Sequence, residues 1–227
     1  MKLSIIIPVF NEVKTIREII NRVKKTGLAH QILVIDDGST DGTVEILREI
    51  SSKNKIQLVE HEKNCGKGCA IRTGLDYVNG DVILIQDADL EYDPREYSNL
   101  LKPLKENICD IVYGSRFLGG ARRPILFWNM VANKLLTFTT NILYNNILSD
   151  METGYKVFRK SVLEGMEIHA NGFDFEPEFT AKMLKNKRRI YEVPISFNPR
   201  DYSEGKKVKM IDAFEAMWTL IKYRFID

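Results

Sequence analysis

The stretch Ile83-Leu84-Ile85-Gln86-Asp87-Ala88-Asp89-Leu90-Glu91 decides the fold, because an uninterrupted apolar run ends abruptly in acidic side chains. A short apolar run without polar alternation is typical of a strand that is buried on both faces near the centre of a parallel sheet. In open α/β sheets, ligands bind beyond the carboxyl ends of the strands. We therefore expect a central strand at 82–85 with a binding site directly after it.

The three acids of this stretch predict a metal site. Extended backbone would place Asp87, Asp89 and Glu91 on one side. Their mutual repulsion is relieved by a hard cation such as Mg²⁺ or Mn²⁺, which binds oxygen ligands and typically also a diphosphate. The alternative is a solvated acidic turn before a helix that begins near Pro94, with Asp93 as its N-cap. The stretch alone leaves both interpretations open.

Outward from this strand, apolar runs alternate with segments of helical periodicity. This alternation predicts parallel βαβ units in a three-layer α/β/α sandwich, as one domain over residues 1–227. The first strand is expected to stop at Pro8. The other strands are expected at 32–35, 56–60 and 108–113, and the helices at 13–25, 43–51 and 68–78.

Composition excludes several classes of protein. A hydrophobic content of 44% and a charged content of 28% fit a globular chain, and the net charge of +2 gives no case for general nucleic-acid binding. The cysteines lack a CxxC pair and the histidines are scattered, which argues against a zinc site or a disulfide framework. These residues are Cys65, Cys69, Cys109, His30, His61 and His169.

The chain shows no signal peptide and no apolar run of the roughly 18 to 20 residues that span a bilayer, so we expect it in the cytoplasm. Segments 124–148 and 210–225 nevertheless have apolar faces broader than a surface helix needs. Two interpretations remain open: packing under the sheet, or helices at a lipid interface with Arg122 and Arg123 facing headgroups.

Three strand ends should meet at one edge of the sheet, namely 8–12, 36–39 and the acids after residue 85. There Phe10 offers a ring for stacking on a base, and Asp37 offers an acceptor for a base N–H. Lys67 lies in a Gly-Lys-Gly segment that suits either an anion at a helix start or a tight turn.

Basic residues of the second half offer groups for phosphates. Arg116 follows a predicted strand, and Arg200 precedes Lys206 and Lys207. For the lysines, the alternative is a solvated charged surface.

Together these motifs resemble family 2 glycosyltransferases of the GT-A fold, and within them the polyprenyl-phosphate sugar transferases that include dolichol-phosphate mannose synthases. The matching segments run in family order over nearly the whole chain: 4–12, 34–43, 64–68, 87–89, 114–116, 150–156 and 204–207. The chain departs from the family pattern at Phe10, where Tyr is common, and at Glu91, where Gln is usual. These departures leave the donor base and sugar open.

The resemblance implies a role for each matching residue. The donor would be bound by Pro8, Phe10, Glu12, Asp37, Lys67, Asp87 and Ala88; the metal by Asp87, Asp89 and Glu91; and phosphates by Arg116, Arg200 and Lys206. Asp89, Arg116 and Asp150 would be the catalytic residues. Residues 1–115 would form the half that binds the nucleotide sugar, and residues 116–227 the acceptor half with its amphipathic helices.

The implied activity is an inverting, metal-dependent transfer of a hexose to a polyprenyl or dolichyl phosphate. The donor would be of the GDP-mannose or UDP-glucose type, and the enzyme would lie on the cytoplasmic face of a membrane. One alternative is transfer to a glycan hydroxyl, with Asp150 or Glu152 as general base. A second alternative is a non-catalytic nucleotide-binding subunit that docks on a membrane.

Overall fold

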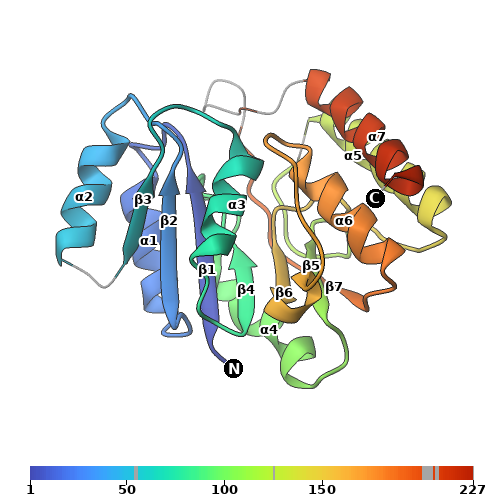
Figure 1. Ribbon diagram of the computed structural model, residues 1–227, viewed down its shortest axis with the longest axis horizontal. Coiled ribbons are helices and arrows are strands. Elements are labelled where there is room, and N and C mark those ends of the chain that lie inside the picture. The colour runs from blue at the N-terminus through green and yellow to red at the C-terminus, as the bar shows by residue number, and fades with distance from the viewer. Residues whose placement is uncertain (54–55, 125, 201–206, 208–209, 227) are drawn as a thin grey trace.

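The structure is a computed structural model that describes residues 1–53, 56–124, 126–200, 207 and 210–226. Its centre is a seven-stranded sheet in the order β3-β2-β1-β4-β6-β5-β7, with helices on both faces (Figure 1). The strands are β1 Leu3–Val9, β2 Gln31–Asp36, β3 Gln57–Glu60, β4 Val82–Ile85, β5 Ile111–Ser115, β6 Lys156–Arg159 and β7 Ile190–Pro194. The helices are α1 Ile16–Lys25, α2 Thr43–Lys53, α3 Lys67–Asp76, α4 Tyr97–Lys105, α5 Phe127–Tyr144, α6 Phe175–Lys185 and α7 Met210–Phe225.

The predicted α/β sandwich with a mostly parallel sheet is confirmed, and β4 has the predicted bounds and is fully buried. Its surroundings differ from the prediction on one side. β4 pairs in parallel with β1 but antiparallel with β6, a strand that the sequence pattern did not reveal. Because β6 lies between β4 and β5, residues before and after position 115 belong to the same sheet. The predicted division into a donor half and an acceptor half therefore has no counterpart in the sheet and stays a prediction about function.

Two boundaries near the N-terminus were predicted wrongly. β1 continues through Pro8 to Val9, because the Pro8 nitrogen lies on the side of β4, whose pairing with β1 ends at Ile6 and Ile85. The missing N–H of proline therefore costs no hydrogen bond in the ladder. Helix α1 begins at Ile16 and not at Val13, since residues 11–15 form turns that hold the Glu12 side chain.

The helices enclose two apolar cores, one on each face of the sheet. Alternate β1 residues point to opposite faces, so Ile5 and Ile7 pack with α1 and α4, while Ile6 packs with α3. Helices α6 and α7 complete the second core, and Figure 1 shows α7 beside α5 at the upper right. Short 3₁₀ turns, Pro94–Glu96 and Lys160–Leu163, precede α4 and follow β6. Asp93 caps the first of these, as predicted.

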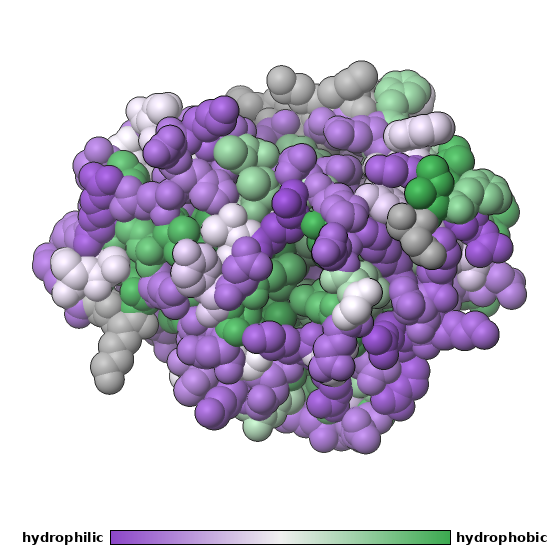
Figure 2. Space-filling model, in the orientation of Figure 1, coloured by the Kyte–Doolittle hydropathy of each residue, from purple (hydrophilic) through white to green (hydrophobic). Residues whose placement is uncertain are grey.

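Helix α5 is only partly covered by the rest of the protein. It buries Leu136, Thr137 and Thr140. Packing against the rest of the protein therefore explains only one narrow face of α5. Large apolar side chains of α5 and α7 and the residues after them remain exposed, and Figure 2 shows apolar groups over this region at the upper right. They are Phe127, Trp128, Leu135, Phe138, Ile142, Ile147, Phe214, Trp218, Phe225 and Ile226. Within the described ranges, no helix is long and apolar enough to cross a bilayer.

Candidate functional site

A cavity of about 730 Å³ opens where β1, β2 and β4 end. It brings together nearly all the site residues expected from the sequence: Pro8, Phe10, Glu12, Asp37, Lys67, Asp87, Ala88, Asp89, Glu91, Arg116 and Arg200. Asp150 lies behind the wall and does not line the cavity, and Lys206 lies outside the described residues. The expectation that these strand ends converge is therefore met by the fold.

The acidic segment after β4 is a turn, as in the alternative interpretation, and not extended backbone. Ala88 and Asp89 form the turn, and Leu90 has a left-handed conformation with φ of 65°. The Asp89 carboxylate accepts a hydrogen bond from the backbone N–H of Glu91 at 3.1 Å, which stabilises this geometry. The turn sends Asp87 in one direction and the other two acids in another.

Each direction ends at a basic side chain. Lys67, in the first turn of α3, lies 2.8 Å from Asp87 Oδ1 and 2.9 Å from Glu176 Oε1 of α6. Arg200 lies on the opposite side, with Nη2 at 3.2 Å from Asp89 Oδ2 and its backbone N–H donating to Glu91 at 2.9 Å. The prediction that one metal gathers all three carboxylates is not reproduced in this arrangement. Among the described residues, their oxygens do not form a group of three within 4.8 Å.

Asp89 is nevertheless poorly compensated. Burial, together with the nearby charges of Glu91 and Asp87, raises the pKa of Asp89 from 3.8 to about 7, although Arg200 acts in the opposite direction. A carboxylate this crowded gains from a nearby cation. Mg²⁺ is usually held by one or two carboxylates together with substrate phosphates, so Asp89 with Glu91 or Asp87 is a sufficient donor set. The site therefore fits a hard divalent ion.

The opposite end of the cavity is built from the ends of β1 and β2. Glu12 accepts hydrogen bonds from both terminal nitrogens of Arg200 at 3.2 Å, and Lys207 Nζ lies 2.7 Å from its Oε1. Lys207 also donates to the carbonyl of Phe10 and lies 5.7 Å from the centre of its ring. Phe10 is thus held next to a cation, with its ring beside the cavity.

Asp37 organises the loop that precedes α3. Its Oδ1 accepts from the N–H of Cys65 at 2.9 Å, its Oδ2 accepts from the N–H of Gly66 at 2.8 Å, and His61 Nδ1 lies 2.7 Å from Oδ1. A carboxylate has about four acceptor positions, so one remains for a base N–H. The predicted contact between Asp37 and the base stays a prediction.

Arg116 and Asp150 form a pair beneath the cavity. Asp150 is fully buried and accepts from Arg116 Nε and Nη2, each at 2.7 Å, and from the Arg116 backbone N–H at 2.9 Å. The charge of Asp150 raises the pKa of Arg116 despite burial. Both oxygens of Asp150 hold this guanidinium in place, and the catalytic role expected of Asp150 stays a prediction.

Glu152, the other candidate for a general base, lies at the cavity itself. It lines the cavity, and its buried Oε1 has no hydrogen-bond partner among the residues that the structure describes. Burial and the nearby Glu176 raise the pKa of Glu152 from 4.5 to about 8. Burial likewise lowers the pKa of its neighbour Lys156 to about 8, although Lys156 donates to the carbonyls of Met151 and Thr153. A carboxyl group of this kind is suited to general acid or base chemistry near neutral pH.

Sequence reasoning missed several residues of this site. Glu176 contacts Lys67, which also contacts Asp87. An acidic residue in a segment with Phe173, Phe175 and Phe179 is unusual, and this pattern could have identified Glu176 as a buried site residue. For Lys207 the sequence left a phosphate site and a solvated surface open, and its side chain lines the cavity. Asn129 and Asn133 of α5 line it too, and nothing in the periodicity of that segment singled them out.

The model of the family described as "Glycosyl transferase family 2" matches residues 4–166. A dolichol-phosphate mannosyltransferase of Pyrococcus furiosus is 33% identical over 211 residues, which cover 91% of this chain and 59% of that protein. A polyprenol monophosphomannose synthase of Mycolicibacterium smegmatis is 30% identical, with 89% and 79% covered. A UDP-N-acetylglucosamine–dolichyl-phosphate N-acetylglucosaminyltransferase of Methanococcus voltae is 28% identical, with 96% and 94% covered.

Solved structures show the same fold. Glucosyl-3-phosphoglycerate synthase of Mycobacterium tuberculosis, in complex with Mn²⁺, uridine diphosphate and glucosyl-3-phosphoglycerate, superposes with a TM-score of 0.77. The match covers 100% of this chain and 81% of that one at 20% identity. The same enzyme with Mg²⁺ and uridine diphosphate gives a TM-score of 0.76. At this level of identity the comparison speaks for the fold alone.

Proposed function

Since the chain belongs to glycosyl transferase family 2 and has the GT-A fold, we propose that it transfers a hexose from a nucleotide diphosphate sugar to the phosphate of a polyprenyl or dolichyl lipid. The reaction inverts the anomeric carbon and requires Mg²⁺ or Mn²⁺. A donor with GDP or UDP fits the base end of the cavity. Three relatives whose names specify dolichyl or polyprenyl acceptors support the choice of acceptor.

One observation carries this proposal: the cavity that holds the acidic and basic cluster extends to the exposed apolar helices. Asn129, Ala132 and Leu136 of α5 line it, as does Ala213 of α7. Other faces of the same helices expose aromatic side chains, among them Trp128 and Trp218 at 71% and 65%. An acceptor with a phosphate head and an isoprenoid tail matches a polar cavity that opens beside an apolar surface.

The same surface supports a peripheral position at a membrane. Arg122 and Arg123, which precede α5, are exposed, and so is Lys222 on α7. Apolar groups flanked by basic ones are typical of helices that lie in a lipid interface. The lipid acceptor would then reach the cavity without leaving the bilayer.

Transfer to a phosphate acceptor requires no proton transfer by a side chain of the protein. An acceptor phosphate is ionised at neutral pH, so its oxygen can attack the anomeric carbon without a general base. The bond from that carbon to the donor diphosphate breaks on the opposite face. Arg200 and Lys207 offer positive charge to the phosphates, and Arg116, held by Asp150, adds a fixed guanidinium.

Asp89, with Glu91 or Asp87, would hold the metal ion, which in such transfers neutralises the leaving diphosphate. In the present arrangement the Arg200 guanidinium pairs with Asp89, and the Arg200 backbone N–H donates to Glu91. A cation at these carboxylates would take over from Arg200 at Asp89 and leave the guanidinium, still held by Glu12, available to a phosphate. Arg200 would then act as a phosphate ligand.

A second candidate function is transfer to a hydroxyl acceptor, and Glu152 favours it. A hydroxyl needs a general base, and Glu152 offers an oxygen without a partner in the described part of the chain and a pKa of about 8 at the cavity wall. The non-catalytic alternative lacks such support, because the chain belongs to a family of transferases and its site residues share one cavity. Transfer of a labelled sugar into a polyprenyl phosphate, compared with a soluble hydroxyl acceptor, separates the two.

A further inference from the structure

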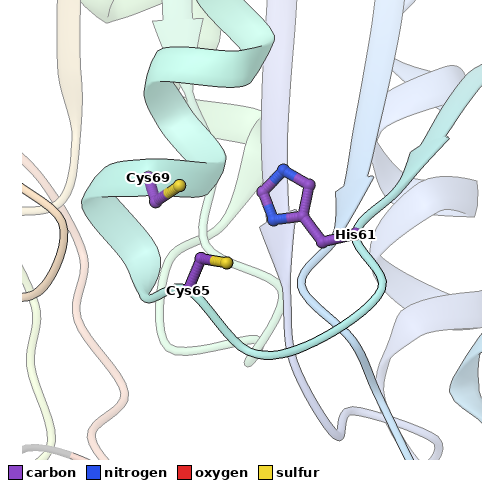
Figure 3. Close-up of side chains that lie close together, drawn as sticks. All are labelled: His61, Cys65 and Cys69. Atoms are coloured by element: carbon purple, nitrogen blue, oxygen red, sulfur yellow. The ribbon is translucent and has the colours of Figure 1, made fainter.

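A second cluster of metal-binding side chains lies outside the cavity. His61 follows β3, Cys65 precedes α3 and Cys69 lies in its first turn, at a regular spacing of four residues. One ligand atom from each lies within 4.8 Å of the others. Figure 3 shows the two sulfur atoms and the imidazole facing a common space between the loop and the helix. None of the three lines the cavity.

The chemistry of this cluster differs from that of the carboxylates. Two thiols and an imidazole are the ligands of Zn²⁺ and related thiophilic cations, whereas Mg²⁺ and Mn²⁺ prefer oxygen. Three protein ligands leave one coordination position open. The side chains are partly buried, so a cation can reach them from solvent without unfolding.

The surroundings of Cys69 favour the neutral thiol over the thiolate. Burial raises the pKa of the Cys69 thiol, and the neighbouring Cys65 and Asp37 add to this effect, with Arg72 opposing it. The Cys69 thiol therefore favours its protonated form in the absence of a cation. A bound divalent ion displaces their protons and stabilises both thiolates.

The cluster is joined directly to the donor end of the cavity. Because the Asp37 carboxylate can only accept, the proton between it and His61 belongs to Nδ1 at 2.7 Å, while Nε2 faces the Thr73 hydroxyl at 3.0 Å. The N–H of Cys65 donates to the same oxygen of Asp37. A change at His61 and Cys65 is thus passed to a residue that lines the donor cavity.

We propose that His61, Cys65 and Cys69 form a binding site for a Zn²⁺-class cation, held through Nδ1 of His61 and both thiolates, and that its occupancy weakens binding of the donor nucleotide. When the cation binds Nδ1, the imidazole carries its proton on Nε2, where it donates to the Thr73 hydroxyl, and Asp37 loses its hydrogen bond from His61. The effect on the donor rests on the proposed function, whereas binding of the cation does not.

Titration of the full chain with Co²⁺ under a phosphine reductant tests the site directly. We expect one equivalent of Co²⁺ to give thiolate-to-cobalt absorption and tetrahedral ligand-field bands, and Zn²⁺ to abolish both by displacement. Cys69→Ser should weaken Zn²⁺ binding at least tenfold, as measured by competition with a chromophoric chelator. Cys109→Ala is the matched control, because Cys109 is buried in the other core and should leave Zn²⁺ binding unchanged.

A second measurement follows binding of a nucleoside diphosphate by calorimetry with and without one equivalent of Zn²⁺. We expect Zn²⁺ to raise the dissociation constant at least fivefold in the wild type and to have no effect in Cys69→Ser. Absence of the thiolate band, or equal Zn²⁺ affinity in Cys69→Ser, would overturn the site. A thiolate band with unchanged nucleotide affinity would overturn its link to Asp37. If no nucleotide binds even without Zn²⁺, the proposed function fails while the cobalt spectrum still decides the metal site.

Discussion

Gly154 leaves no room for a side chain beside Asp87. A Cβ at Gly154 would lie 2.2 Å from Asp87 Oδ2, so only glycine allows the carboxylate to keep its position near Lys67. We predict that Gly154→Ala displaces Asp87 and lowers the transfer rate roughly 10²-fold, as expected for misplacement of a site residue by about 1 Å. The matched control is Gly172→Ala, whose Cβ would meet only Asp174 Oδ1 at 3.5 Å. Equal activity of the two variants would contradict a role for the Asp87 position.

Asp89 should make the ligand-free protein less stable as the pH rises. Its pKa is raised from 3.8 to about 7, so between these values the folded chain holds a proton that the unfolded chain releases. Stability is therefore lost as the pH rises through this window. We predict that Asp89→Asn raises the Tm in EDTA by a few degrees at pH 8 and by less at pH 5. A lower Tm than wild type at pH 8 would show that the ion pair with Arg200 outweighs burial.

Arg200 should act mainly on the acceptor. We predict that Arg200→Gln raises the KM for a polyprenyl phosphate by at least tenfold, equivalent to about 1.4 kcal/mol, and changes the donor KM less than threefold. Arg189→Gln serves as the control, since Arg189 pairs with Asp110 at 2.9 Å on the exposed surface. Steady-state kinetics with each substrate varied in turn measures both constants. Equal losses for donor and acceptor would refute this division of roles.

Glu152 distinguishes the two candidate acceptors. With a phosphate acceptor, Glu152→Gln should keep the transfer rate within about tenfold of wild type, because no proton has to be removed. With a hydroxyl acceptor, the same change should cost roughly 10²-fold to 10⁴-fold, and wild-type activity should rise with pH through about 8 as Glu152 ionises. Glu164→Gln, at an exposed position, is the control. A large loss with the phosphate acceptor would remove the main argument for base-free attack.

The exposed aromatic residues of α7 should contribute to membrane binding. Phe214 and Trp218 are 71% and 65% exposed, so Phe214→Ser with Trp218→Ser should leave the Tm nearly unchanged. Binding to vesicles of anionic and zwitterionic lipid should fall at least tenfold, since each aromatic side chain withdrawn from water contributes about 1.5–3 kcal/mol. Tyr77→Ser, also at an exposed aromatic residue but after α3, should bind as wild type does. If the double variant sediments with vesicles as well as wild type does, these residues do not contribute to membrane binding.

Local patterns sufficed to predict much of the fold. The strand at 82–85 has the predicted bounds because four apolar residues without alternation suit a buried strand. By contrast, β6 is a short strand that begins and ends with basic residues, and it is stabilised by pairing with β4 and β5, which lie far away in the chain. The turn after β4 was one of two interpretations that the local pattern left open, because Leu90 adopts a left-handed conformation that leucine rarely favours.

Site residues at the ends of strands could be predicted from the sequence. Side-chain contacts between positions far apart in the sequence could not. Convergence at the carboxyl edge brought Asp37 and Asp89 to one cavity. The partnership of Lys67 with Glu176 joins positions 109 residues apart, and no local pattern reveals it. Likewise, spacing without a CxxC pair argued against a thiol metal site, whereas the loop before α3 brings Cys65 and Cys69 together with His61.

The most direct test of the central claim is a transfer assay with radiolabelled nucleotide sugars and a short polyprenyl phosphate, with Mn²⁺ or Mg²⁺ and in EDTA. We predict that label from one donor enters the organic phase only when the metal is present, and that Asp89→Ala abolishes this transfer while its circular dichroism spectrum stays that of wild type. Label that reaches only a soluble hydroxyl acceptor would contradict transfer to a lipid phosphate, and full activity of Asp89→Ala would contradict the role of Asp89 in metal binding.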